Sequence, residues 1–297
     1  TDYAAALAER YEDLPDASTS AKDLVLDDLP DPDGALDGFL VGFHLMRTLR
    51  YVEAAPWLED PGLADVRLAR ELALTTTLVE LMGLLRAEEM ATLYKKAGIL
   101  IVRTKHVEAD FGSSSAGTQH LLCVAYSMQE RDAAALAEAK RGLALSPYSH
   151  VTLVNAAEAA LSVEDLDAVH AFAKQGLRLL PNYFKFWKNR FDAARDAGDY
   201  NLAREFIDRA FEHDESNSTL ELTERLNIDL DEAFNLISVD LSRAQELCAS
   251  VRLRAETGLQ GHPRQSAFID SATAIATGEQ AAVLVHVLER LQVRPLN

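Results

Sequence analysis

The sequence predicts an all-α fold, and three observations carry that prediction. Alanine, leucine, glutamate and arginine are abundant in the 297-residue chain, and these residues favour helix. Apolar residues recur at intervals of three and four, which is the spacing of one face of a helix. Prolines and glycines fall between such segments rather than inside them, where they would end or kink a helix.

Taken in order, the apolar pattern predicts a series of helices separated by short turns. The expected ranges are 2–11, 35–52, 63–74, 76–86, 88–108, 117–129, 133–145, 149–161, 165–179, 183–196, 200–212, 219–236, 240–256, 264–276 and 279–291. Residues 12–34 contain three prolines among acidic and small polar side chains, so we expect a loop there. The run SSSAG at 113–117 marks a second boundary.

The middle of the chain repeats. Ser146-Pro147 closes one helical pair, Leu180-Pro181 closes the next 34 residues later, and Asp214-Glu215 follows after the same interval. A fixed period that contains a helix, a turn and a second helix indicates a repeat architecture.

Particular residue types recur within these units. Unit 184–217 has aromatic, turn and small residues at positions 4, 15 to 17, 20 and 27, namely Trp187, Gly198, Asp199, Tyr200, Ala203 and Ala210. Unit 116–149 has Leu122, Tyr126, Ala135 and Pro147 at positions 7, 11, 20 and 32. Unit 150–183 keeps Pro181 but has Ala160 and Val169 where Tyr and Ala are usual. This pattern resembles the tetratricopeptide repeat (TPR), in which small residues allow close helix approach and large ones fill the gaps.

The resemblance implies an α-α superhelix, a right-handed TPR-like solenoid with an atypical helical N-terminal part. We expect four parts: an acidic, loop-rich segment at 1–34, a helical part at 35–115, three repeats at 116–217, and C-terminal helices at 218–297. Residues 218–263 are expected to be helical but out of register. Residues 264–297 form a degenerate repeat with Gly278 and Pro295 at positions 15 and 32. Residues 35–115 are either degenerate repeats or a separate cap.

Charge and cysteine content narrow the function. The net charge of −18 opposes binding to nucleic acid or to an anionic membrane, and no apolar run is long enough to insert into a membrane. Half of the excess charge lies in residues 1–37, whereas residues 174–209 are a basic island with eight bases and five acids. Cys123 and Cys248 are expected to be buried thiols, which together with the absence of a secretory signal favours a reducing, cytoplasmic location.

The resemblance also implies where a partner would bind. In tetratricopeptide domains the first helix of each unit lines the concave face through positions 2, 5, 6, 9 and 12. The candidate partner-binding residues at such positions are His120, Asn155, Glu158, Lys185, Lys188, Asn189 and Asp192. Chaperone-binding members hold a C-terminal carboxylate with five residues, of which this chain has two, Asn155 and Lys185, so that clamp is not predicted.

The segment 183–206 is rich in both aromatic and basic residues. One interpretation is a basic groove, flanked by aromatics, for an acidic or carboxylate-bearing peptide. The other is that most of the aromatics pack between helices. The acidic head has two interpretations as well, a solvated linker or an internal competitor for the basic island. Under the groove hypothesis, Lys185→Glu with Lys188→Glu weakens partner binding without unfolding the chain.

An enzyme is the alternative class. The aspartate cluster from Asp27 to Asp33 resembles the magnesium motif of isoprenoid synthases, and Ser238, Ser242 and Glu246 have the spacing of a second metal motif. Two prolines interrupt the cluster, and Ser238 stands where Asn or Asp is usual. Searches for phosphate loops, dinucleotide fingerprints, zinc motifs and nucleophile elbows find nothing. We therefore expect no catalytic residue, cofactor or metal, and a scaffold or adaptor that binds a protein or peptide and also self-associates.

Overall fold

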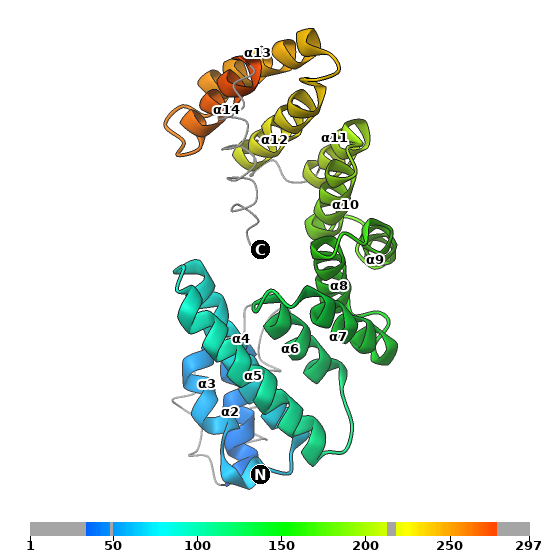
Figure 1. Ribbon diagram of the computed structural model, residues 1–297. Coiled ribbons are helices and arrows are strands. Elements are labelled where there is room, and N and C mark those ends of the chain that lie inside the picture. The colour runs from blue at the N-terminus through cyan, green and yellow to red at the C-terminus, as the bar shows by residue number, and fades with distance from the viewer. Residues whose placement is uncertain (1–33, 48–49, 213–217, 278–297) are drawn as a thin grey trace, which may run out of the picture. The chain divides into compact units, whose positions relative to one another are not determined.

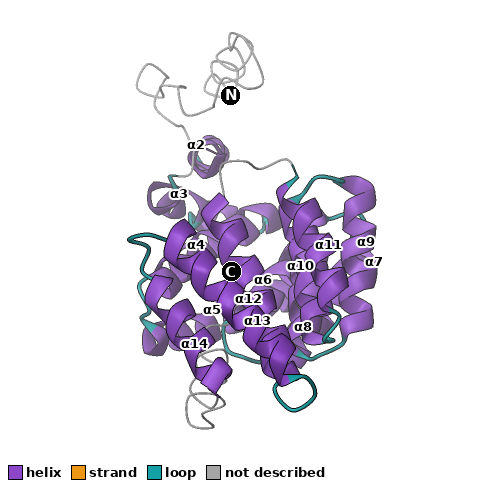
Figure 2. Cartoon of the chain, turned by 90° about the horizontal axis from the view of Figure 1, so that it is seen from above, coloured by secondary structure: helices purple, strands orange, loops and turns teal. Residues whose placement is uncertain are grey.

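The computed structural model describes residues 34–47, 50–212 and 218–277, and all regular structure in these residues is helical (Figures 1 and 2). The predicted all-α class is confirmed. The helices predicted at 2–11 and 279–291 lie outside the described residues, as does the aspartate cluster from Asp27 to Asp33.

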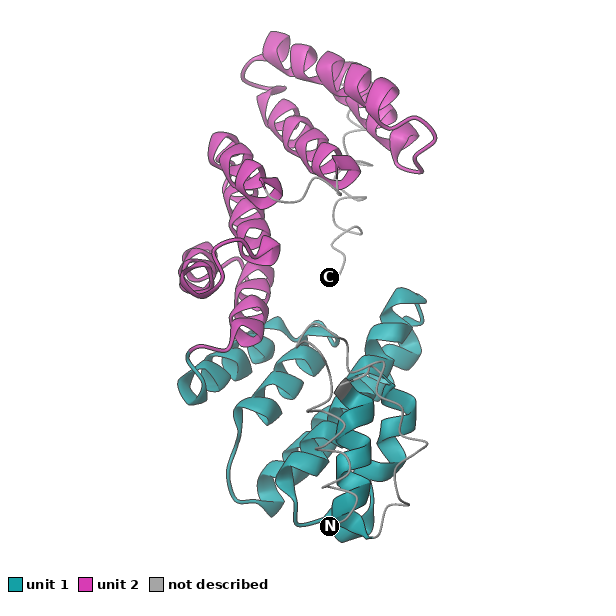
Figure 3. Ribbon diagram, turned by 180° about the vertical axis from the view of Figure 1, so that it is seen from behind, with its two compact units in different colours: residues 1–147 teal, residues 148–297 magenta. Residues whose placement is uncertain are grey.

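The chain divides into two compact units, residues 1–147 and residues 148–297 (Figure 3). The first contains α2 (Ala35–Arg47), α3 (Tyr51–Leu58), the short 3-10 helix η2 (Pro61–Leu63), α4 (Arg67–Arg86), α5 (Met90–Asp110), α6 (Ala116–Ser127) and α7 (Asp132–Leu145). The second contains α8 (His150–Ser162), α9 (Leu166–Leu179), α10 (Phe184–Asp196), α11 (Tyr200–Phe211), α12 (Ser218–Leu236), α13 (Leu241–Gly258) and α14 (Gln265–Thr277).

Within each unit, helices that are consecutive in sequence pack against one another, which confirms the α-α superhelix. The boundary between the units falls at Pro147, inside the region 116–217 that the sequence suggests is one run of repeats. The four-part division remains a prediction.

The repeat interval is visible in the helix boundaries. The first helix of each pair, α6, α8, α10 and α12, begins at Ala116, His150, Phe184 and Ser218, so each starts 34 residues after the last. The second helices α7, α9 and α11 begin at 132, 166 and 200, with the same interval. The period therefore extends into α12, one helix further than the residue pattern indicated.

The register is lost inside α12 rather than before it. This helix has 19 residues, whereas α8 and α10 have 13 each. The six extra residues of α12 and a turn that is one residue longer start α13 at Leu241, seven residues after the position 234 that the interval gives. The prediction that 218–263 is helical and out of register is thus correct for α13 and wrong for the start of α12.

The turn inside each pair has one backbone conformation. Glu130, Glu164 and Gly198 stand at position 15 of the three units and have φ of 56°, 60° and 76°. After each of them, the next amide donates to a carbonyl five residues earlier, for example from Asp165 to Ala160 at 2.9 Å. This is the Schellman closure of a helix, which favours glycine because a side chain is strained at positive φ.

The same turn joins α4 to α5, far from the recognisable repeats. Glu88 has φ of 58°, and the amide of Glu89 donates to the carbonyl of Leu84 at 3.0 Å. The two helices are longer than their counterparts, with 20 and 21 residues. Residues 67–110 therefore form a helical hairpin with the same closing turn as the repeats, and whether residues 35–115 are degenerate repeats or a separate cap stays open.

The joints between pairs also match. Ser146 and Leu180, each followed by proline, have φ/ψ of −140°/82° and −134°/82°. Their amides donate to the carbonyls of Gly142 and Gly176 at 2.8 and 2.9 Å. A proline disfavours the α conformation in the residue before it, and both second helices end at the same point before their proline.

Three predicted helices differ from the structure in the N-terminal part. The helix expected at 35–52 ends at Arg47, and a second helix, α3, comes next with Pro56 inside it. The helices expected at 63–74 and 76–86 are one helix, α4. Its buried residues continue across the expected break, and the hydroxyls of Thr75 and Thr76 bond to the carbonyls of Glu71 and Ala73. Threonines that satisfy their hydroxyls on the preceding turn do not interrupt a helix.

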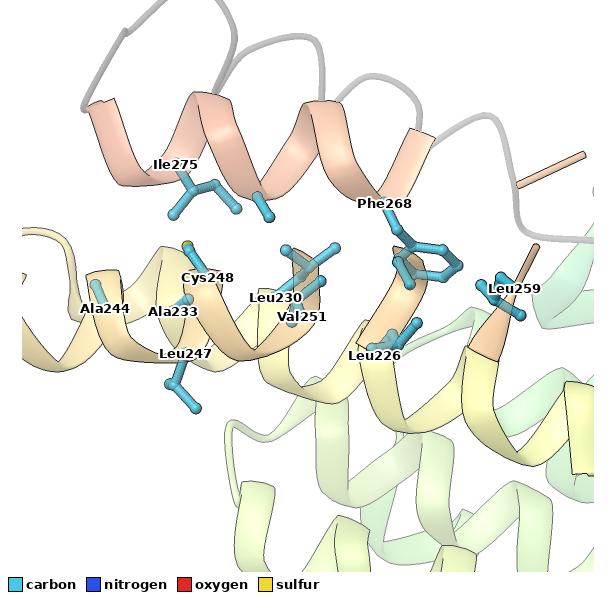
Figure 4. Packing of buried hydrophobic residues seen from close by; sticks show 12 residues of the cluster. Leu226, Leu230, Ala233, Ala244, Leu247, Cys248, Val251, Leu259, Phe268 and Ile275 are labelled. Carbon is cyan, nitrogen blue, oxygen red and sulfur yellow. The ribbon is translucent and has the colours of Figure 1, made fainter. Parts of the chain in front are cut away.

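The second unit has two kinds of core packing, one mainly aliphatic and one in which an aromatic ring packs against a glycine. Helices α12, α13 and α14 share a cluster of buried aliphatic side chains with one ring, Phe268 (Figure 4). Between α9 and α10 the ring of Phe186, fully buried, lies directly against Gly176, so that a β-carbon at Gly176 would overlap the ring. A glycine on α9 thus makes room for an aromatic side chain on α10.

Candidate functional site

Six of the seven predicted partner-binding residues lie on two neighbouring first helices of the second unit. Asn155 and Glu158 are on α8, and Lys185, Lys188, Asn189 and Asp192 are on α10, which packs against α8. His120 lies on α6, in the first unit, where it is half-buried and where burial lowers its pKa below the ordinary value. The structure therefore brings six of the residues into one unit and leaves His120 in the other.

The residues of α8 and α10 are linked by ion pairs. Lys185 Nζ lies 3.6 Å from Glu158 Oε1, and Lys188 Nζ donates to both carboxylate oxygens of Asp192 at 2.9 Å. Asn189 is buried, with 4% of its surface exposed, and its Nδ2 has no hydrogen-bond partner among the described residues. An unpaired buried amide costs about 1–3 kcal/mol, so Asn189 is a strained point under this surface.

Three further charged residues belong to the same surface and were missed. Arg195 lies 3.8 Å from Asp192, 3.7 Å from Glu224 and 3.6 Å from Asp231, and Glu224 also lies 3.6 Å from Lys188. Arg195 stands at position 12 of its unit, so the position rule could have found it. Glu224 and Asp231 lie on α12 at positions 7 and 14 of the 34-residue interval, which the position rule does not include, so no signal in the sequence indicated them.

These residues form what we call the first-helix charge cluster: Glu158, Lys185, Lys188, Asp192, Arg195, Glu224 and Asp231. It contains three bases and four carboxylates, so the lysines of the basic island face an excess of acid contributed by α8 and α12. Only Lys185 keeps much of its side chain exposed, at 42%, whereas the side chains of Lys188 and Arg195 are 19% and 20% exposed.

Burial and pairing set the electrostatics of the cluster. Burial raises the pKa of Glu158 above its ordinary value, and the nearby ammonium of Lys185 only partly offsets this. Burial acts to lower the pKa of Arg195, but the carboxylates of Asp192, Asp231 and Glu224 outweigh it and hold the pKa above its ordinary value. The cluster therefore keeps Arg195 charged inside a largely desolvated surface.

Two other arginines of the basic island pair with carboxylates outside the first-helix charge cluster. Arg204 pairs with Asp229 at 2.7 Å and with Glu232, and Arg209 pairs with Glu212 at 3.1 Å. The aromatic residues of the segment mostly pack between helices. Phe191 and Phe206 are buried in one cluster of α10, α11 and α12, against which the side chains of Phe184, Trp187 and Tyr200 pack.

The described residues contain neither a metal-binding group nor a membrane-spanning helix. No group of three or more histidine, cysteine or carboxylate side chains in residues 34–47, 50–212 and 218–277 could hold a metal ion. Glu246, from the suggested second metal motif, pairs with Arg243 at 3.0 Å. Cys123 and Cys248 are both buried thiols, and burial raises the pKa of Cys248 to about 11. None of the described helices could cross a membrane.

Comparisons with known proteins then decide the fold. No protein-family model matches the sequence, and no curated protein matches it. Among solved structures, a tetratricopeptide repeat protein from Parabacteroides merdae matches 84% of this chain and 95% of its own, with 9% identity and a TM-score of 0.52. The chain has the fold of a tetratricopeptide-repeat solenoid. A second match, in the APC/C hetero-tetramer Cut9-Hcn1, has 14% identity and a TM-score of 0.51 and covers all of this chain but 47% of the matched one, so this chain spans about half its length.

The chain has this fold but departs from the tetratricopeptide residue pattern at informative positions. Position 8, where a small residue is expected, is Ala157 in one unit but the fully buried Phe191 in the next. Position 15, where glycine is expected, is glutamate at Glu130 and Glu164. The residue pattern of the repeat is therefore incomplete at these positions, whereas the backbone keeps the 34-residue interval and the turn conformation.

Proposed function

We propose that this tetratricopeptide-type chain is a protein-binding scaffold that holds an extended segment of a partner along α8 and α10, with Lys185 as the main contact to an acidic residue. The observation that carries the proposal is the uneven exposure of the first-helix charge cluster. Lys188 and Arg195 are largely covered and lie within 4 Å of two and three carboxylates, whereas Lys185 is exposed and lies within that distance of one carboxylate among the described residues, Glu158, at 3.6 Å. A partner carboxylate can therefore compete for Lys185 at little cost.

Other features support binding rather than catalysis. The described residues offer no metal-binding group, and the side chains of the first-helix charge cluster pair with one another. The net charge of −18 argues against nucleic acid as the partner, and two buried thiols suit a cytoplasmic location. Self-association through the ends of the repeat stack remains part of the proposal.

The structure changes how the proposal is best tested. Lys188→Glu would place a new carboxylate beside Asp192 and Glu224, so a loss of binding in that variant could reflect loss of structure. Lys185→Glu avoids this because its side chain is exposed. The matched control is Lys174→Glu, which makes the same charge change at an exposed position on the second helix α9.

The experiment is affinity purification of the full chain with quantitative mass spectrometry, and then titration of the partner recovered in stoichiometric amount. We expect Lys185→Glu to weaken that partner at least five-fold, Lys185→Gln to weaken it less, and Lys174→Glu to leave it unchanged. Equal affinity of the Lys185→Glu and Lys174→Glu variants would remove the assignment of the site to α8 and α10.

A further inference from the structure

The second unit has a pocket between α10 and the second helices α9 and α11. It has a volume of about 540 Å³, which is within the range of sites for small ligands or for one or two side chains. Its walls include Trp187 and Arg190 of α10, Phe206 of α11 and His170 of α9. No residue of the first-helix charge cluster lines it, so a ligand site here is independent of the proposed function.

Arg190 is held in this pocket by rings rather than by carboxylates. Its guanidinium carbon lies 4.0 Å from the ring centre of Phe206 and 5.4 Å from that of Trp187. The Trp187 indole is itself fixed, because its Nε1 donates to the carbonyl of Pro181 at 2.9 Å. Stacking covers the faces of the guanidinium and leaves its edge, which carries all the N–H donors, to point elsewhere.

Two polar atoms of the pocket lack partners. Arg190 Nε and His170 Nδ1 are both buried, and neither has a hydrogen bond to any described residue. Arg190 also makes no ion pair within the described part of the chain, in contrast to Arg195, Arg204 and Arg209 nearby. A charged donor preorganised by two rings, with an open edge and a second unpaired polar atom lining the same pocket, is the pattern of a ligand site.

The neighbouring charges select the kind of ligand. Glu205 and Glu212 also line the pocket, and Arg209 neutralises only Glu212, at 3.1 Å. Because burial and the charge of Arg190 lower the pKa of His170, this side chain is neutral near pH 7 and adds no positive charge. Glu205 acts on Arg190 through its charge without forming an ion pair, so a dianionic phosphate would meet one cation that this carboxylate already partly compensates. A singly charged carboxylate fits the guanidinium fork and brings half as much negative charge into the pocket as the dianion.

We infer that this pocket binds a carboxylate group of a peptide, with Arg190 as the forked donor and His170 as a second hydrogen-bonding group. Two sources present this chemistry, a glutamate or aspartate side chain and a C-terminal carboxylate. The pocket would then give the scaffold a second contact point on α9, α10 and α11, separate from Lys185.

The two tryptophans allow a direct test in the full-length chain. Trp187 lines the pocket and Trp57 lies in the other compact unit, so their indole N–H signals in ¹H–¹⁵N NMR serve as reporter and internal control, assigned with Trp57→Phe. The probes are the blocked peptide acetyl-Ala-Ala-Glu-Ala-Ala-amide, its Gln counterpart, acetyl-Ala-Ala-Ala-Ala-Ala with a free C-terminus, and inorganic phosphate. We expect saturable shifts of the Trp187 signal with the Glu peptide or the free C-terminus, and whichever binds more tightly identifies the source.

Variants test the role of the guanidinium. Arg190→Gln should weaken binding at least ten-fold, and Arg190→Lys, which keeps the charge without the fork, about three- to ten-fold. Arg252→Gln, an exposed arginine on α13, should change nothing. If the Arg190→Gln variant loses its native circular dichroism, the test rests on the unmodified chain, where the Glu peptide should shift the Trp187 signal and the Gln peptide should not. An unmoved Trp187 signal, equal shifts with the Glu and Gln peptides, unaltered binding by a folded Arg190→Gln variant, or tighter binding of phosphate would each overturn the inference.

Discussion

The helix pairs α8–α9 and α10–α11 have similar lengths, the same turn and the same 34-residue spacing, yet they are filled in opposite ways. The buried side chains of α8–α9 are mostly small, with Ala156, Ala157, Ala159, Ala160, Ala173 and Gly176 among them. Those of α10–α11 include Phe186, Phe191, Phe206, Ile207 and Phe211. The turns and joints of this chain therefore maintain the repeat, while each pair has its own packing solution. Substitutions in the cores and the turns test this difference.

The largest expected effect is at position 8 of the aromatic pair. Phe191 is fully buried, so Phe191→Ala leaves a cavity and should lower the free energy of unfolding by about 4 kcal/mol. Urea unfolding monitored by Trp187 fluorescence in a Trp57→Phe background measures it. The control is Tyr148→Ala, whose side chain is 77% exposed and whose removal should cost less than about 0.5 kcal/mol. Similar losses in both variants would contradict the assignment of the aromatic core.

The next largest loss of stability is expected where the alanine-rich pair α8–α9 meets the aromatic pair α10–α11. Gly176→Ala on α9 should cost about 2 kcal/mol, because its methyl group would overlap the buried ring of Phe186. Phe186→Leu in the same chain should recover part of that loss, as a double-mutant cycle would show. Gly83→Ala on α4 is the matched control. No atom lies within 4 Å of the added carbon there, so it should stabilise by about 0.5–1 kcal/mol.

Substitutions at position 15 of the two turns should change the free energy of unfolding in opposite directions. Glu164→Gly relieves a side chain held at φ of 60° and should stabilise the chain by about 0.5–1 kcal/mol, whereas Gly198→Ala should destabilise it by about 1 kcal/mol. Glu130→Gly is a weaker test because the Glu130 carboxylate accepts a hydrogen bond from Tyr94, raising the pKa of that tyrosine to about 12. If Glu164→Gly and Gly198→Ala shift the unfolding midpoint in the same direction, the two turns are not equivalent.

The smallest effect is a dependence on pH. Burial first, and the charge of Arg190 second, lower the pKa of His170 below its ordinary value of 6.5, with Asp167 opposing. The unfolded chain then takes up a proton near pH 6.5 that the folded chain takes up only at lower pH. Stability is therefore complete above pH 6.5 and falls as the pH drops through 6.5 toward the lowered pKa. The ring proton signals of His170 in an NMR titration should show a pKa below 6.5, and a value at or above 6.5 would contradict the burial.

The sequence predicts most of the fold because the repeat depends on local signals. Proline after Ser146 and Leu180 ends the second helices, and the apolar spacing locates the helices between such joints. The missed features depend on contacts that spacing does not report. The continuity of α4 depends on threonine hydroxyls bonding within the helix, and the length of α12 depends on its packing against α13 and α14.

The candidate site was less predictable. Position rules found the residues on α8 and α10 but not the acids of α12, so they suggested a basic surface where the structure shows mixed charge. The pocket at Arg190 was hidden for a related reason. Composition indicated a basic, aromatic segment in 183–206, but only the fold shows that Arg190 faces α9 and α11 while Lys185 faces α8.

The matching joints at Ser146 and Leu180 have a consequence for how such a chain can change over generations. Because the two backbones enter their prolines at nearly the same angles, the chain from 148 to 181 is a cassette with interchangeable ends. Recombination between the two joints can duplicate or delete that cassette without requiring any new turn to be invented. Once duplicated, each copy is free to acquire its own interior, as the alanine-filled and phenylalanine-filled pairs illustrate.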